Sequence, residues 1–373
     1  MDHAPDTTGS AAAGPTTTAP TGSSVVAPGG TATAAPAWRR PSRDRGTVVL
    51  GGLLALTVLA LLPPILGNGF PGLFLQRLFD SLSNGVAYAM TAIGLVLIFK
   101  ATGIINFVQA NLSMFGAYLC WQFVVGWNVP IAVGIVVGCV VMAAAGAGIE
   151  RTLIRPFDPT DPLPIVLVTF GLAAIFEAFA GGLWGLEFHA FPSPFPAGPQ
   201  DFVSVAGARF RYETIASLVL LALVVGGLHL LLNRTKLGLR FRAVSSSVES
   251  ARLAGIRVGP TLQFGWALAA AFGTLGAALV AKQTNLEPAF MAKLVIFAFA
   301  AATLGGLDSI GGAVVGSFVV AAVQSLVLGY GQELPGLGWM KSNFSLVVAF
   351  VLILIVLLFK PVGLFGTRTT ERV

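Results

Sequence analysis

Three polar side chains recur at helical spacing inside an apolar stretch that runs from residue 103 to 125. They are Asn106, Gln109 and Ser113. Positions three or seven residues apart share one face of an α-helix, so we expect the three side chains to lie together. Amides and hydroxyls without partners are costly in an apolar environment. Two interpretations stay open: this face hydrogen-bonds a neighbouring helix, or it lines a path along which a polar solute passes.

Glu177 is an ionisable residue inside a second apolar stretch, residues 163–184. A charged side chain in the middle of a membrane-spanning helix costs about 2.5–3.5 kcal/mol on insertion scales, so such a residue is a candidate for function. An ion pair with Lys293, which also lies in an apolar stretch, would offset that cost. The other interpretation is that Glu177 lines the same path.

A polar, basic segment, residues 233–260, lies between two of the apolar stretches. It carries one acid, Glu249, against six basic residues: Arg234, Lys236, Arg240, Arg242, Arg252 and Arg257. Loops rich in Lys and Arg stay on the cytoplasmic side of a membrane. We therefore expect this segment to face the cytoplasm.

Within that segment the residue types predict a short helix. The three serines at 245–247 can cap its start, and Glu249 in the first turn suits the positive end of the helix dipole. Gly255 can end it. Its small apolar face consists of Ala251, Leu253 and Ala254. Such a face can dock into a groove on another protein; the alternative is that the charges of the loop only fix its orientation.

The composition identifies an integral membrane protein. Of 373 residues, 55% are hydrophobic and only 10% are charged, whereas soluble domains carry about 25% charged residues. The net charge of +6 comes from short clusters between apolar stretches, which membrane orientation explains better than nucleic-acid binding does. Membrane lipid is the expected environment, and no nucleic-acid partner is expected.

The residue types that catalysis or metal binding requires are scattered. His3, His189 and His229 are isolated from one another, and Cys120 and Cys139 lie inside apolar stretches as small core residues. The phosphate-binding pattern Gly-x-x-x-x-Gly-Lys-Ser/Thr does not occur, so the chain cannot itself hold ATP. We expect no catalytic residue, no metal site and no cofactor, and hence no enzyme.

Apolar stretches of about 17–25 residues predict an all-α membrane protein with about ten membrane-spanning helices. We place them at residues 47–66, 80–99, 103–125, 129–149, 163–184, 214–233, 262–281, 288–304, 311–330 and 344–360. With the amino terminus in the cytoplasm, most of the 22 Lys and Arg residues fall on cytoplasmic segments, so both termini are expected there. Two five-helix halves would be related as inverted repeats.

Three regions follow one another along the chain. Residues 1–46 are rich in Ala, Thr, Pro, Gly and Ser and are expected to form a disordered cytoplasmic tail. Residues 47–366 are expected to form the membrane domain, and residues 367–373 a cytoplasmic carboxyl-terminal tail. The longest outer loop, residues 185–213, is either a docking surface for an external partner or a lid over the mouth.

Two segments resemble the branched-chain amino-acid permease family of ATP-binding-cassette (ABC) importers. The first resembles the family's Gly-x-Ile-Asn-Phe signature with its later Met and Gly-x-Tyr, at Gly103, Ile105, Asn106, Phe107, Met114, Gly116 and Tyr118. It departs at Ala110 and Asn111, where the family commonly has a Gly and an acid. The second resembles the family's coupling loop, with Ser250 in place of an Ala and matches at Glu249, Ala251, Arg252, Leu253, Gly255 and Ile256. The resemblance extends over residues 78–365.

The resemblance implies a multi-pass permease subunit in a bacterial-type plasma membrane, which moves branched-chain amino acids or a related small solute, such as an amide or urea, inward. It implies three partners: a cytoplasmic ABC ATPase dimer, a second related permease that forms a heterodimer with this one, and an extracytoplasmic solute-binding protein. The ATPase would grip the loop at Arg242, Glu249, Ala251, Arg252, Leu253 and Gly255. The alternative is a secondary transporter or channel for a small polar solute, with Glu177 and Lys293 in proton or ion coupling.

Overall fold

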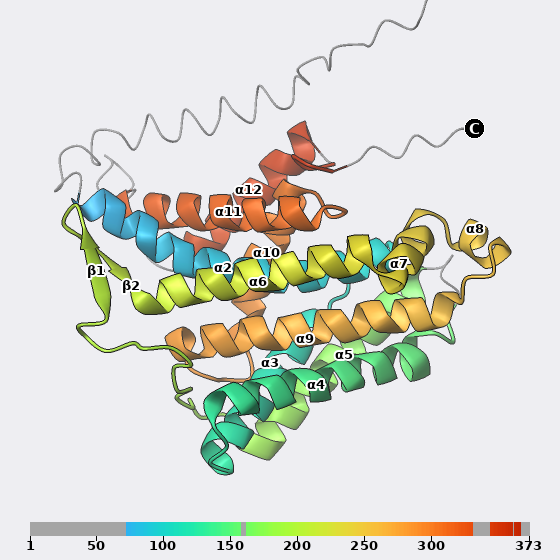
Figure 1. The fold of residues 1–373 in the computed structure, drawn as a ribbon, viewed down its shortest axis with the longest axis horizontal. Helices are drawn as coiled ribbons and strands as arrows, with labels where there is room; N and C mark the ends of the chain where they lie inside the picture. Colours follow the sequence, from blue (N-terminus) through green and yellow to red (C-terminus); the bar gives the residue numbers. More distant parts are fainter. Residues whose placement is uncertain (1–71, 158–161, 331–343, 361, 367–373) are drawn as a thin grey trace, which may run out of the picture. The chain divides into compact units, whose positions relative to one another are not determined.

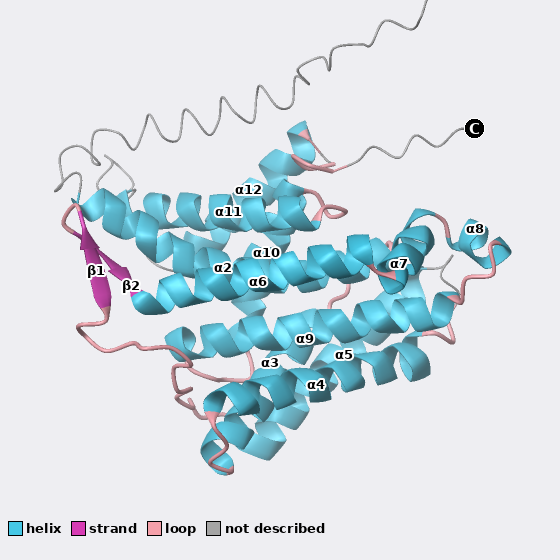
Figure 2. Cartoon of the chain, in the orientation of Figure 1, coloured by secondary structure: helices cyan, strands magenta, loops and turns pink. Residues whose placement is uncertain are grey.

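The computed structural model describes residues 72–157, 162–330, 344–360 and 362–366. The predicted amino-terminal tail, the predicted span at residues 47–66 and the carboxyl-terminal tail lie outside the described residues. The described part is mostly helical, as the composition predicts (Figure 1, Figure 2). Six of its helices are long and apolar enough to cross a membrane, and two more are shorter apolar helices.

The elements follow one another in a simple order. The α-helices are α2 (Gly72–Thr102), α3 (Gln109–Trp121), α4 (Ile131–Ile149), α5 (Pro162–Trp184), α6 (Tyr212–Arg234), α7 (Lys236–Ser246), α8 (Val248–Leu253), α9 (Val258–Thr284), α10 (Phe290–Gly305), α11 (Ile310–Tyr330) and α12 (Ser345–Phe359). The π-helical segments η1 (Gln122–Gly126) and η2 (Glu150–Ile154) extend α3 and α4, and strands β1 (Phe202–Val205) and β2 (Ala208–Arg211) precede α6.

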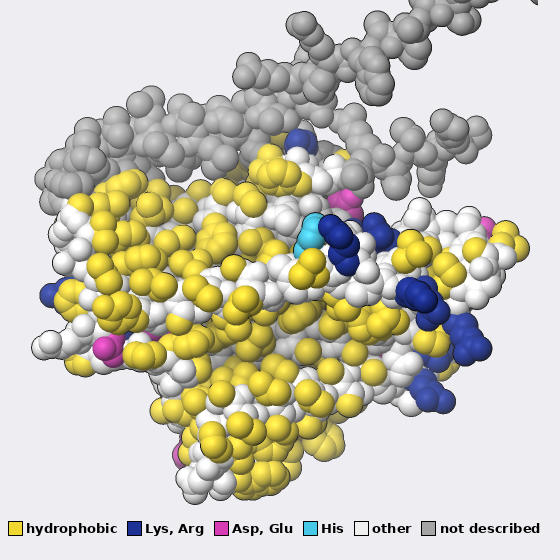
Figure 3. All heavy atoms as spheres, in the orientation of Figure 1, with side chains coloured by type: hydrophobic (Ala, Val, Ile, Leu, Met, Phe, Trp, Pro, Cys, Tyr) yellow, Lys and Arg dark blue, Asp and Glu magenta, His cyan; other side chains and the backbone are white. Residues whose placement is uncertain are grey.

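Helices α2 and α9 form the centre of the helical bundle. α2 packs against α9 and α11, while α9 also packs against α3 and α4. Met90, Tyr118 and Trp266 are among the large side chains that are fully buried in this region. α4, α5 and α6 are mostly exposed, and much of their exposed surface is apolar (Figure 3). A helix that is apolar on all sides suits contact with lipid or with another membrane subunit.

The span predicted at residues 103–125 is wrong at its start, because α3 begins only at Gln109. Gly103, with a φ of 71°, follows the last residue of α2. The side-chain oxygen of Asn106 then accepts a hydrogen bond from the Val108 N–H at 3.2 Å, which forms an Asx turn ahead of α3. Asn106 therefore does not share a helical face with Gln109 and Ser113. The other predicted spans from residue 80 onward each contain a helix.

The long loop at residues 185–213 contains a β-hairpin that the sequence does not predict. β1 and β2 pair antiparallel with Val205 opposite Ala208, so the turn consists of Ala206 and Gly207, both with positive φ. Turns of this kind match the twist of paired strands. The loop is also fixed at His189, whose backbone exchanges hydrogen bonds of 3.0 and 2.9 Å with Leu286, between α9 and α10.

Candidate functional site

The basic segment between α6 and α9 contains two helices rather than one. The first, α7, begins after Thr235, whose Oγ1 accepts a hydrogen bond from Gly238 N at 3.1 Å. It buries Gly238, Phe241 and Val244 and packs on α6 and α9. We did not predict α7 from the sequence. Its signals were a threonine cap and the three-residue spacing of Phe241 and Val244, which is typical of a helix with one buried face.

The short helix predicted from the serines and Gly255 is confirmed as α8. Ser247 is its cap, because its hydroxyl oxygen accepts a hydrogen bond from Ser250 N at 3.1 Å, and Glu249 lies in the first turn. The helix ends before Gly255, which has a φ of 76° that few other residues adopt. Ile256 N donates to the carbonyl oxygen of Ala251 at 2.9 Å, a typical helix-end contact.

The side chains of α8 divide into an anchor and an exposed surface. Ala251 is buried against the chain itself, so it does not belong to the exposed surface. Leu253 is 91% exposed, a value that is unusual for a leucine on an ordered helix. The other exposed residues predicted for this site are Arg242, Glu249, Arg252 and Gly255. α8 thus presents an apolar side chain among charged ones.

Positive charge gathers at the end of the bundle that carries α7 and α8 (Figure 1, Figure 3). We call this the basic end; Arg155 and Arg252 belong to it, and so does Lys100 in the last turn of α2. Lys100, near the end of α2, donates to the backbone oxygen of Asp308 ahead of α11 at 3.2 Å. The end of α2 and the start of α11 therefore contact each other, while α8 contacts α7 and α9.

An ion pair lies at η2, the segment that extends α4, and contacts α9 through Arg155 at the basic end. The Glu150 carboxylate is 1% exposed and accepts two hydrogen bonds from the Arg155 guanidinium, which is a bidentate arrangement. Arg155 also donates to the side-chain oxygen of Gln263 on α9 at 3.3 Å. Gln263 in turn donates to the Ala147 carbonyl at 3.2 Å. We did not predict this pairing, because both groups lie at the end of a stretch that changes from α- to π-helical hydrogen bonding.

The predicted polar face on α3 is only partly formed. Gln109 and Ser113 are fully buried one helical turn apart and face α9, where the Gln109 amide donates to the Ala269 carbonyl at 3.0 Å. The Ser113 hydroxyl donates back to the Gln109 carbonyl at 2.7 Å. Asn106 is also buried, but in the turn before the helix. This geometry favours the interpretation that Gln109 joins two helices.

Glu177 lies on the exposed side of α5. Its carboxylate is 3.5 Å from the side-chain nitrogen of Asn111, which donates a shorter hydrogen bond of 2.9 Å to the Ala173 carbonyl. Lys293 is exposed on α10. Ion pairs between described residues join Glu150 to Arg155 and Glu213 to Lys282, and they include neither Glu177 nor Lys293. The structure therefore offsets the charge of Glu177 with an amide and not with the lysine.

The fold and this site define a multi-pass membrane protein with an exposed, capped helix at its basic end. The chain belongs to the family described as "Branched-chain amino acid transport system / permease component", whose family model matches residues 77–357. This is a family of permease components and not of enzymes.

Known relatives agree with this assignment. The chain is 28% identical over 313 residues to the high-affinity branched-chain amino acid transport system permease protein BraD of Pseudomonas aeruginosa, a match that covers 80% of this chain and 98% of that protein. It is 26% identical over 318 residues to the corresponding LivH protein of Escherichia coli K12, with the same coverage. The galactose/methyl galactoside import permease MglC of Escherichia coli K12 is 29% identical over 219 residues, 56% of this chain and 61% of that protein.

Proposed function

We propose that this chain is the membrane-spanning permease subunit of an ABC importer, driven by a separate ATPase, that moves branched-chain amino acids or a related small solute into the cell. The observation that carries the proposal is α8, with Leu253 exposed at its surface. An apolar side chain displayed on a capped helix suits a partner's groove. The names of the relatives support the class of solute.

The coupling site consists of the exposed residues around α8. Leu253 enters the groove of the ATPase, while Glu249, Arg252 and Arg242 make polar contacts at its rim. Gly255 allows close approach, since the space around its α-carbon is open. The buried side chain of Ala251 would hold α8 against the rest of the permease. Closure of the ATPase dimer would move α8 and, through α7 and α9, the membrane helices.

The number of coupling helices requires a second permease subunit. One chain supplies one α8, whereas an ATPase dimer offers two grooves, and we propose a related permease as the partner in a heterodimer. The full subunit would have ten membrane helices in two inverted halves, with the span at residues 47–66 as its first. Both tails, residues 1–46 and 367–373, would lie in the cytoplasm with α8.

The β-hairpin is the proposed contact for an external solute-binding protein. Its exposed residues include Arg209 and Arg211 on β2, and the Arg209 guanidinium lies over the Phe202 ring at 5.0 Å from the ring centre. A fixed hairpin with two cations suits a partner surface that carries carboxylates. The hairpin precedes α6, whereas α7 follows it, so the hairpin lies across the bundle from the basic end (Figure 1).

Glu177 is the residue that we place on the translocation path. Since a carboxylate in contact with lipid is costly, the exposed side of α5 around Glu177 is expected to face a polar surface or water. The space between the two permease subunits would supply that environment. Gln109 and Ser113 would support the path by holding α3 against α9, and Asn106 would lie at its basic end.

Glu177→Gln is expected to reduce the rate of solute uptake about tenfold. The solute would lose a hydrogen bond to a charged carboxylate, and such a bond contributes about 1.5–3 kcal/mol. Uptake of radiolabelled leucine by cells measures the effect. Glu187→Gln, which removes an exposed carboxylate outside the helices, is the matched control. Normal uptake by Glu177→Gln would remove this residue from the path.

Purification of the tagged protein from its native host in mild detergent tests the proposed function. We expect nucleotide-binding subunits and a second permease to co-purify in fixed ratio, and uptake to persist when an ionophore collapses the ion gradients. A secondary transporter predicts the opposite: a protein that purifies without an ATPase, and uptake that an ionophore abolishes.

A further inference from the structure

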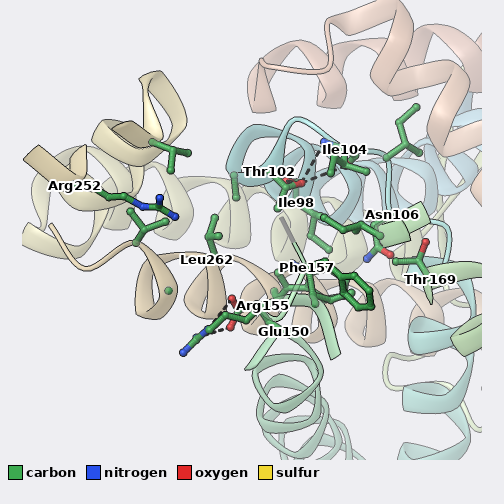
Figure 4. A pocket seen from close by; sticks show the side chains of 18 residues that line it. Ile98, Thr102, Ile104, Asn106, Glu150, Arg155, Phe157, Thr169, Arg252 and Leu262 are labelled. Atoms are coloured by element: carbon green, nitrogen blue, oxygen red, sulfur yellow. Dashed lines mark hydrogen bonds and ion pairs between the residues drawn. The ribbon is translucent and has the colours of Figure 1, made fainter. Parts of the chain in front are cut away.

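A cavity of about 350 Å³ lies at the basic end, between the end of α2, the turn before α3, η2, α5, α8 and the start of α9 (Figure 4). This volume is at the small end of the range for ligand pockets, roughly 300–1,000 Å³. Its walls are mainly aliphatic and include Ile98, Ile104, Ile154, Ile165 and Leu262. The cavity therefore suits a small molecule with a branched apolar body.

Two buried nitrogen atoms of residues that line this cavity lack hydrogen-bond partners among the described residues. They are the amide nitrogen of Asn106, which is 4% exposed, and the indole nitrogen of Trp266, which is 2% exposed. Both carry N–H groups that can only donate. Buried donors are normally paired, so an acceptor group on a molecule bound in the cavity would satisfy two donors that the chain leaves unpaired.

Apart from Arg252, the other polar side chains of the cavity are already engaged in hydrogen bonds. The Glu150 carboxylate is taken by Arg155. The Thr169 hydroxyl, near Asn106 in Figure 4, donates to the Val166 carbonyl at 2.8 Å. Arg252 of α8 also lines the cavity and adds positive charge. Among the described residues that line the cavity, the free polar groups are therefore donors and a cation, with no free carboxylate to receive an ammonium group.

We propose that this cavity binds a small branched aliphatic carboxylate. The carboxylate would accept from Asn106 and Trp266, with Arg252 as a nearby countercharge, and the aliphatic body would lie among the isoleucines. Because the cavity's own carboxylate is already paired, a simple acid should bind better than the corresponding amino acid.

Occupancy of the cavity bears on coupling, because Val248 and Arg252 of α8 form part of its wall. A bound acid would hold α8 in place against η2 and α9, and so would regulate transport from the cytoplasmic side. This consequence rests on the proposed function. The binding itself does not, since it concerns this chain alone and can be measured without an ATPase.

Calorimetric titration of the full-length chain in lipid nanodiscs with isovalerate tests the proposal. Asn106→Asp removes the free donor but keeps the oxygen that accepts from Val108 N. Trp266→Phe removes the other donor and keeps an aromatic ring. Each variant is expected to bind isovalerate about ten- to a hundredfold more weakly than the unchanged protein, since each loses a hydrogen bond to a charged group. Trp184→Phe is the matched control, because the indole nitrogen of Trp184 donates to Gln122 outside the cavity. The affinity of this variant for isovalerate should be unchanged.

Valine, which is isovalerate with an added α-amino group, and palmitate serve as comparison probes in the same titration. We expect valine to bind more weakly than isovalerate, and palmitate to be too long for the cavity. The proposal is overturned if isovalerate does not bind the unchanged protein, or binds both variants equally well. Binding of palmitate alone would also overturn it, by identifying the cavity as a lipid site. If Asn106→Asp fails to fold, the affinity of Trp266→Phe for isovalerate still tests whether the cavity binds the acid. Co-purification of the ATPase tests the proposed transport function separately.

Discussion

Leu253→Glu is expected to abolish solute uptake while leaving the protein folded in the membrane. The Leu253 side chain is 91% exposed, so its replacement removes almost no contact within the chain, and exposed substitutions of this kind usually change stability by less than about 0.5 kcal/mol. Burying a leucine in a partner's groove contributes about 1.5–3 kcal/mol, and a buried unpaired carboxylate adds a further penalty. Binding of the ATPase should therefore fall more than about a hundredfold.

Radiolabelled leucine uptake and the amount of co-purified ATPase measure this effect together. Leu253→Met keeps the apolar character and should retain both. Gly255→Glu should also block docking, but it introduces strain as well, because the φ of Gly255 is 76°. Gly255→Asn separates backbone strain from blocked docking, since asparagine tolerates a positive φ. Normal uptake by Leu253→Glu would exclude α8 as the coupling element.

The parts of the site that depend on local sequence could be predicted, and α8 shows why. A serine cap, an acid in the first turn and a terminal glycine act within a few residues of one another, and all are found in or beside α8. Which side of α8 faces outward could not be predicted. Ala251 and Leu253 look equally suited to docking in the sequence, and only the position of α7 and α9 decides that Ala251 is buried.

Contacts between distant segments were the least predictable. The spacing of Asn106 and Gln109 indicated a common helical face, but an Asx turn after Gly103 competes with the helix and separates them. Similarly, the apolar surroundings of Glu177 and Lys293 suggested an ion pair, whereas Asn111 on α3 lies nearer to Glu177. Long apolar stretches identify the membrane helices because lipid requires them, but they carry little information about which helices become neighbours.

The ion pair between Glu150 and Arg155 is expected to contribute strongly to the stability of the protein. Arg155→Met is expected to destabilise the protein by about 3–5 kcal/mol, because it leaves a buried carboxylate without its countercharge. Glu150 is only 1% exposed, whereas the Arg155 side chain is 35% exposed. Water can therefore solvate the charge of an unpaired arginine but not that of an unpaired glutamate. Glu150→Gln should consequently cost less than Arg155→Met, although each removes one member of the same pair.

A thermal unfolding series in detergent tests this asymmetry with four proteins: the unchanged chain, Arg155→Met, Glu150→Gln, and the double variant. The double variant should recover much of the stability lost in Arg155→Met, because the carboxylate that lacked a partner is gone. Recovery would show that the cost arises from the buried charge. If the two single losses simply add, then Arg155 stabilises the protein mainly through its contact with Gln263, and the link between η2 and α9 depends on that amide instead.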